Sequence, residues 1–138
     1  MLRIESYGHT ESGDNKTALK WVYENPVWKV GIKNWKPAND ISGTTCLERH
    51  NKTDELFILL DGHCTLLYAD DDNGKAVNIG KVEMEPMKVY KIPATLWHNT
   101  VTQPDAKLVL IENNPTDMTN SDVYNLTDDQ IAEIKALV

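Results

Sequence analysis

The sequence contains no long hydrophobic run, and this absence excludes several classes of protein. None of its apolar stretches approaches the length that an α-helix needs to cross a bilayer. Residues 1–6 lack the apolar segment of a secretory signal, so we expect a cytoplasmic protein with no membrane partner. The sequence also lacks a phosphate-binding loop, a dinucleotide-binding fingerprint and the Gly-x-Ser-x-Gly motif of hydrolases.

Cysteine and clustered positive charge are scarce as well. The chain has only two cysteines in 138 residues, and they do not form a Cys-x-x-Cys pair. We expect Cys46 and Cys64 to be reduced, with a disulfide between them as the alternative. The net charge is −7 and the acidic residues are spread along the chain, which argues against a nucleic-acid-binding surface.

What the sequence does contain is a series of short strand patterns separated by turns. Strands of this kind indicate an all-β sandwich or barrel. The length suits one domain over residues 1–138, with a core at about 28–112, an N-terminal strap at 1–20 and a C-terminal tail and helix at 113–138. We expect strands at residues 21–23, 28–34, 44–50, 54–60, 63–68, 76–82, 87–92, 98–102 and 107–111.

The clearest alternation begins at Trp28. Trp28, Val30 and Ile32 fall on one face of the expected strand, whereas Lys29 and Lys33 fall on the other. This pattern predicts a half-buried strand.

The apolar run at residues 54–60 places large hydrophobic side chains on both faces of a strand. One face would line the barrel, and something outside would cover the other. The outer row offers a contact for a second copy of the chain, so we expect a homodimer. The row consists of Leu56, Ile58 and Leu60.

Turns and one helix complete the expected fold. The acidic run at 70–72 lacks the ligand spacing of an EF-hand and predicts a hairpin turn with Asn73 and Gly74. Residues 113–125 are polar, and we expect them to wrap the surface. Thr127 to Gln130 has capping-box spacing before an apolar periodicity, which predicts a short C-terminal helix.

Three residues that can bind a metal occur close together in the middle of the sequence. Glu48 and His50 are two apart, so they point to the same face of a strand. Glu55 opens the next strand and would return beside His50 if the two strands pair. This set of side chains suits a divalent ion, and His98 could supply a fourth group.

At these residues the sequence resembles the cupin superfamily, in particular small single-domain cupins. His50, Glu55 and Gly62 match the first cupin motif in type and spacing, and Pro93 and His98 match the second. The matched segment runs from about residue 43 to 102. The sequence departs from the motifs at Ser42 (with Gly43 one step late), Glu48 in place of the first histidine, Met87, Thr95 and Thr102.

The resemblance implies a double-stranded β-helix, or jelly-roll barrel, with one metal at its centre. Carried over residue by residue, the ligands are His50, Glu55 and His98, with Glu48 as the fourth. In the alternative, Glu48 lies beside the metal as a general base. Mn²⁺, Fe²⁺ and Zn²⁺ suit this set best, and Ni²⁺ and Co²⁺ remain possible. A barrel that has lost its metal would instead leave Glu48 and His50 as an ion pair, which is costly to bury.

We do not expect the remaining candidate residues to bind the metal. We expect His9 to be exposed and His63 to lie outside the ligand set. Cys46 shares a face with Glu48 and His50, so it either lines the pocket or fills space. Trp97 would point away from His98 and serve packing.

The function implied is a metal-dependent isomerase, lyase or epimerase that acts on a small polar metabolite, such as a sugar or sugar acid. An open coordination position would polarise the substrate, and a carboxylate would move the proton. The alternatives are a non-catalytic small-molecule-binding cupin, with a structural metal or none, and an iron-dependent dioxygenase.

Overall fold

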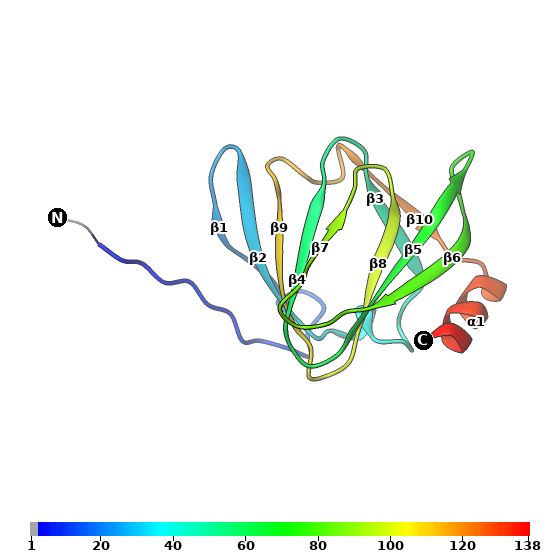
Figure 1. The fold of residues 1–138 in the computed structure, drawn as a ribbon, viewed down its shortest axis with the longest axis horizontal. Helices are drawn as coiled ribbons and strands as arrows, with labels where there is room; N and C mark the ends of the chain where they lie inside the picture. The colour runs from blue at the N-terminus through cyan, green and yellow to red at the C-terminus, as the bar shows by residue number, and fades with distance from the viewer. Residues whose placement is uncertain (1–2) are drawn as a thin grey trace.

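The computed structural model describes residues 3–138, which form two five-stranded antiparallel sheets facing each other (Figure 1). One sheet has the strand order β1-β2-β9-β4-β7 and the other β10-β3-β8-β5-β6. The all-β prediction is therefore confirmed. The elements are β1 (Leu19–Glu24), β2 (Trp28–Asn34), the 3₁₀ helix η1 (Pro37–Asn39), β3 (Cys46–His50), β4 (Glu55–Asp61), β5 (Cys64–Asp72), β6 (Lys75–Glu83), β7 (Val89–Ile92), β8 (Trp97–Thr102), β9 (Lys107–Asn113), β10 (Ser121–Asn125) and α1 (Asp128–Leu137).

Two hydrophobic clusters stabilise the fold. The first lies between the sheets and includes Phe57, Leu59 and Leu108. The second lies on the outer face of the β8 sheet, where Trp97 and Val101 pack under Ile134 of α1. Trp97 is 2% exposed, so the prediction that it serves packing is confirmed.

The predicted strand β2 has its expected length but the opposite facing. Lys29 and Lys33 point into the barrel and are 8% and 7% exposed, whereas Trp28 is 42% exposed. The interior at this end is polar, and it pairs Lys29 with a buried carboxylate. The side chains on neighbouring and facing strands therefore decide which face of β2 is buried, and the expectation that its apolar face would be buried is wrong.

The polar tail holds a strand that the sequence pattern did not indicate. Within the segment expected to wrap the surface, Ser121–Asn125 form β10 and pair with β3 in antiparallel register. Ser121 lies opposite His50, and Asn125 lies opposite Cys46. The unpaired edge of β3 recruits this segment through main-chain hydrogen bonds, which need no hydrophobic pattern.

Several local predictions are confirmed. Asn73 and Gly74 have φ of 50° and 87°, as a two-residue hairpin turn between β5 and β6 requires. Thr127 caps α1 through a reciprocal capping box with Gln130. Along β4, Phe57 and Leu59 are buried, and the opposite row is more exposed. Among residues 3–138, no helix is long and apolar enough to span a membrane.

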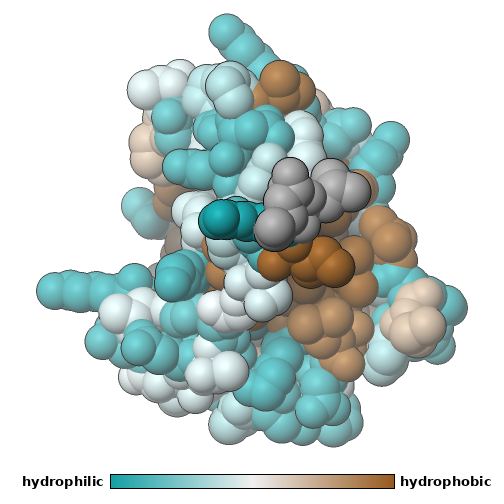
Figure 2. All heavy atoms as spheres, turned by 90° about the vertical axis from the view of Figure 1, so that its left-hand side faces the viewer, coloured by the Kyte–Doolittle hydropathy of each residue, from teal (hydrophilic) through white to brown (hydrophobic). Residues whose placement is uncertain are grey.

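The N-terminal leader extends away from the barrel beside β1 (Figure 1). Residues 3–18 form no strand, and β1 begins at Leu19. Seen from that end, a patch of hydrophobic residues lies on the face turned toward the viewer (Figure 2). Tyr23 packs between Tyr7 and Trp28 with its ring tilted against both, and the ring centroids are 6.1 and 5.1 Å away. Met1 and Leu2 of the expected strap lie outside the described residues.

Candidate metal centre

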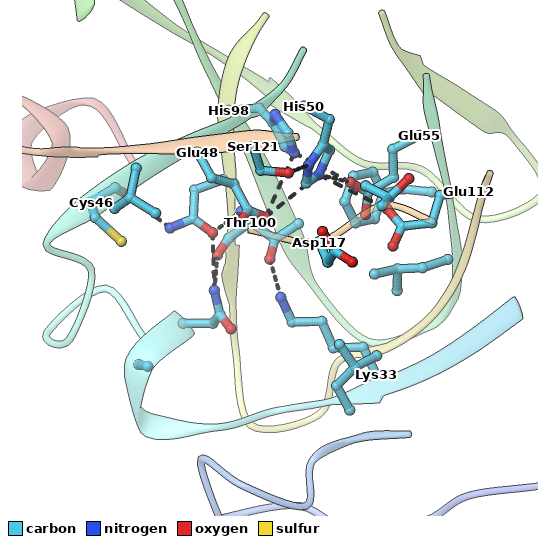
Figure 3. Close-up of a pocket in the computed structure, with 18 of the residues that line it drawn as sticks. Lys33, Cys46, Glu48, His50, Glu55, His98, Thr100, Glu112, Asp117 and Ser121 are labelled. Atoms are coloured by element: carbon cyan, nitrogen blue, oxygen red, sulfur yellow. Dashed lines mark hydrogen bonds and ion pairs between the residues drawn. The ribbon is translucent and has the colours of Figure 1, made fainter. Parts of the chain in front are cut away.

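Three strands bring together the four side chains that the sequence singled out. Glu48 and His50 come from β3, Glu55 from β4 and His98 from β8 (Figure 3). Each offers one ligand atom, and these atoms lie within 4.8 Å of one another. We call these residues the four-residue cluster. Strand pairing accounts for two of them, since Glu48 lies directly opposite His98 across the β3–β8 ladder. Glu55 reaches the cluster from the facing sheet, so the expected pairing of its strand with that of His50 is wrong.

His98 presents an unpaired ring nitrogen to the centre of the cluster. Its side chain is 1% exposed, and its Nδ1 donates a hydrogen bond to the Leu96 carbonyl at 3.0 Å. This bond places the proton on Nδ1, so Nε2 carries a lone pair. Nε2 is buried without a hydrogen-bond partner, 3.5 Å from Glu55 Oε2 and 3.9 Å from Glu48 Oε1.

His50 is held from both sides. Its Nε2 hydrogen-bonds Glu55 Oε2 at 2.8 Å, and its Nδ1 hydrogen-bonds Ser121 Oγ of β10 at 2.8 Å. Burial alone would lower the pKa of His50, but the hydrogen bond and charge of Glu55 outweigh it and raise this pKa. The same interactions hold the pKa of Glu55 at about 2, although burial alone would raise it.

Glu48 is the most accessible member of the cluster. Its side chain is 43% exposed, whereas that of Glu55 is 4% exposed. Glu48 Oε1 lies 4.0 Å from His50 Nε2, so the close partner of His50 is Glu55. A metal-free barrel would thus rest mainly on the His50–Glu55 pair, and the Glu48–His50 pair that the sequence suggested is the longer of the two.

The residues present fit a divalent transition metal. Two imidazoles and two carboxylates are an ordinary ligand set for such ions. Hydrogen bonds from outside the set orient both rings, as is usual for metal-binding histidines. Among the described residues, no group forms a hydrogen bond with the buried lone pair on His98 Nε2. Metal ligation by the four residues remains a prediction.

The cluster lies at one side of a cavity of about 430 Å³ inside the barrel. This volume lies within the range of small-molecule sites. Lys33 lines it as well, and its Nζ donates a hydrogen bond to Thr100 Oγ1 at 2.7 Å. Sequence reasoning missed Lys33, because it assigned this lysine to the solvent side of β2. It also missed Ser121, because the polar sequence of this segment does not predict strand β10.

Glu112 is a further cavity residue that the sequence analysis missed. It is 6% exposed on β9, and Lys29 Nζ lies 3.5 Å from its Oε1. Burial, and then the charge of Glu55, raise the pKa of Glu112 to about 7. The sequence did contain a signal for this position, since Glu112 falls on the same face of the strand as Leu108 and Leu110.

The other histidines and the cysteines stay outside the cluster. His63 is exposed between β4 and β5 and pairs with Asp105 at 2.8 Å, as expected of a residue outside the ligand set. His9 is partly buried and hydrogen-bonds the Thr17 carbonyl, so it is less exposed than predicted. Cys46 lines the cavity, and both it and Cys64 are free thiols.

Comparison with known proteins identifies the architecture. No protein-family model and no curated protein matches the sequence. Solved structures do match. Pac13, described as a unique nucleoside dehydratase, has 8% identity and a TM-score of 0.59 over 81% of each chain. A variant of Streptomyces Pac13 solved with uridine has 9% identity and a TM-score of 0.59, over 81% of this chain and 80% of that one.

KdgF from Halomonas sp. has 13% identity and a TM-score of 0.50, over 83% of this chain and 93% of that one. These likenesses concern the course of the backbone, since the identities are too low to carry more. They agree with the two facing antiparallel sheets and with the motif residues that converge inside the barrel. The chain therefore has the double-stranded β-helix, or jelly-roll, fold that the sequence predicted.

Proposed function

We propose that this protein is a metal-dependent enzyme of the lyase or isomerase type that acts on a small polar metabolite. The observation that carries the proposal is the buried lone pair of His98 Nε2, which points at three further donors beside an accessible cavity. A buried nitrogen without a partner costs free energy unless something binds it. A divalent ion held by the four-residue cluster is the species that fits.

The side chains around the cavity suit proton transfer. A bound divalent ion would polarise a carbonyl or hydroxyl oxygen of the substrate. Glu48 is partly exposed and faces the substrate space, so it serves either as the fourth ligand or as the base. Glu112, with a pKa of about 7, can accept or return a proton near neutral pH, and Lys29 stabilises its ionised form.

The comparisons support this class of reaction at the level of the fold. Pac13 is described as a nucleoside dehydratase, so the same barrel accommodates elimination chemistry on a small polar molecule. The candidate ions remain Mn²⁺, Fe²⁺ and Zn²⁺, followed by Ni²⁺ and Co²⁺. A non-catalytic binding protein is the second candidate, because four protein ligands can close a tetrahedral site and leave no position for a substrate.

Elemental analysis of untagged protein tests the proposal. We expect about one transition metal per chain in the wild type and less than a tenth of that in His50→Ala and His98→Ala, because each change removes one of four ligands. His63→Ala is the matched control, since it removes a histidine that lies outside the cluster. This variant should keep the wild-type metal content.

A wild type that carries no metal and takes up none of the five candidate ions would contradict the proposed mechanism. For a loaded protein, the number of exchangeable water ligands, measured on the Mn²⁺ form by water-proton relaxation, separates the two candidates. Bound exchangeable water favours the enzyme, whereas a closed site favours the binding protein.

A further inference from the structure

The cavity contains a buried lysine without a carboxylate partner. Lys33 is 7% exposed and lines the same cavity as the four-residue cluster. Its ammonium group can donate three hydrogen bonds, yet within residues 3–138 it makes one, to the neutral Thr100 Oγ1 at 2.7 Å, and forms no ion pair. Burying an unpaired charge is costly, so such a group calls for a counter-ion.

The other charges of the cavity do not supply this counter-ion. Glu112 is paired with Lys29, which approaches it to 3.5 Å. Asp117 is exposed at the edge of the cavity and accepts its hydrogen bonds from Thr119. The carboxylates of the four-residue cluster would be neutralised by the divalent ion proposed above. One positive charge then remains inside the barrel.

Lys33 lies across the cavity from the two histidines and points toward Thr100 (Figure 3). Thr100 and His98 are two residues apart on β8 and are both buried at 1% exposure, on the same face of the strand. Two residues along a strand span about 7 Å. A molecule of the size of a hexose can therefore contact the cluster at one end and the lysine at the other.

We propose that Lys33 binds a carboxylate group of the substrate, so that the enzyme acts on a polyhydroxy acid and discriminates against the corresponding neutral sugar. This inference rests on the proposed function, because it assumes that the substrate occupies the same cavity. Burial lowers the pKa of Lys33 to about 8, so the side chain is still mostly protonated at pH 7. Lys36 lies on the same side of the cavity and adds to the positive potential.

The test compares two probes that differ only in one terminal carbon, D-glucuronate and D-glucose. Each is titrated into the wild type by isothermal titration calorimetry at pH 7, with and without added Zn²⁺. We expect glucuronate to bind about 10- to 100-fold more tightly than glucose, the range of a charge-assisted hydrogen bond. Equal affinities, or no binding of glucuronate, would overturn the inference without reference to any variant.

Variants assign the preference to Lys33. Lys33→Met should bring the two affinities to within about threefold, and Lys33→Arg should keep most of the difference because it restores the charge. Lys91→Met is the control, since it removes one exposed positive charge from the outer side of β7. A preference that survives in Lys33→Met, or that disappears equally in Lys91→Met, would contradict the assignment.

Metal content, measured in parallel, keeps the two proposals separate. A protein without metal that still prefers glucuronate through Lys33 would contradict the proposed metal and leave this inference standing. A metal-loaded protein that binds glucuronate and glucose equally would contradict the role of Lys33 and leave the proposed metal standing. Lys33→Met should carry the same amount of metal as the wild type, because Lys33 is not in the four-residue cluster.

Discussion

Among the single residues of the site, Glu55 shows how burial and partners together decide the charge of a side chain. It is 3% exposed, a position that would favour a neutral acid. His50 donates to it at 2.8 Å, and His98 Nε2 lies 3.5 Å away. The carboxylate is therefore ionised in the folded protein, with a pKa of about 2.

This lowered pKa predicts a specific acid sensitivity of the metal-free protein. An acid whose folded pKa lies below its unfolded value of 4.5 stabilises the fold above pH 4.5 and loses that contribution as the pH falls through about 2. The wild type should therefore lose about 2 kcal/mol from this group between pH 6 and pH 3. Glu55→Gln should lack this component of the loss.

Urea denaturation in the presence of a chelator at both pH values measures the difference. Glu133→Gln, which changes an exposed carboxylate on α1, is the control and should follow the wild type. The same loss of stability in wild type and Glu55→Gln would show that Glu55 is not held ionised by its hydrogen bond with His50.

At the scale of elements, two connections between strands show the separate effects of backbone conformation and of packing. Gly62 joins β4 to β5 and Gly74 joins β5 to β6, with φ of 76° and 87°. A Cβ on Gly74 would meet no atom within 4 Å, whereas a Cβ on Gly62 would lie 2.2 Å from the Asp105 carbonyl oxygen. Gly62 is also one of the residues that match the first cupin motif.

We therefore predict unequal costs for the same substitution. Gly74→Ala should lower the free energy of unfolding by about 1 kcal/mol, the cost of a side chain in the left-handed region. Gly62→Ala should cost at least about 3 kcal/mol, because it adds a steric overlap with backbone that cannot move aside easily. Urea denaturation midpoints of the two variants test this. Equal losses in the free energy of unfolding would show that the loop containing Asp105 moves to accommodate the new side chain.

At the scale of the whole molecule, the sheet that contains β4 carries the outward apolar row expected to contact a second copy. Leu56 and Ile58 are half-buried, and Leu60 is 55% exposed. On the neighbouring strand, Val89 pairs with Ile58 and is 61% exposed. Homodimerisation through this face remains a prediction.

The mass in solution tests it. We expect light scattering coupled to gel filtration to give twice the chain mass of 15.6 kDa. Because Leu60 is already exposed in the single chain, Leu60→Glu should leave the fold intact and shift the mass toward one chain. Val123→Glu, at an exposed position on the opposite sheet, is the matched control and should not change the mass. A wild-type mass of one chain would contradict the prediction.

The sequence alone determined the features that depend on neighbouring residues. Alternation predicted most of the strands, Asn73 and Gly74 predicted their turn, and the capping box at Thr127 predicted α1. Strand geometry placed Glu48 beside His50, because residues two apart point to one face. These are local rules, and a linear pattern carries them. Glu55 and His98 joined the predicted cluster through the resemblance to the cupin motifs.

The tertiary structure alone decided what depends on a partner far along the chain. Lys29 and Lys33 face inward because Glu112 lies beside Lys29 on the neighbouring strand β9 and Thr100 lies on the facing sheet, and no pattern within β2 contains that information. Ser121 supports His50 because the edge of β3 was left to be paired by a polar segment. A strand's own sequence specifies that it has two faces, whereas the side chains opposite determine which face is buried and what chemistry it serves.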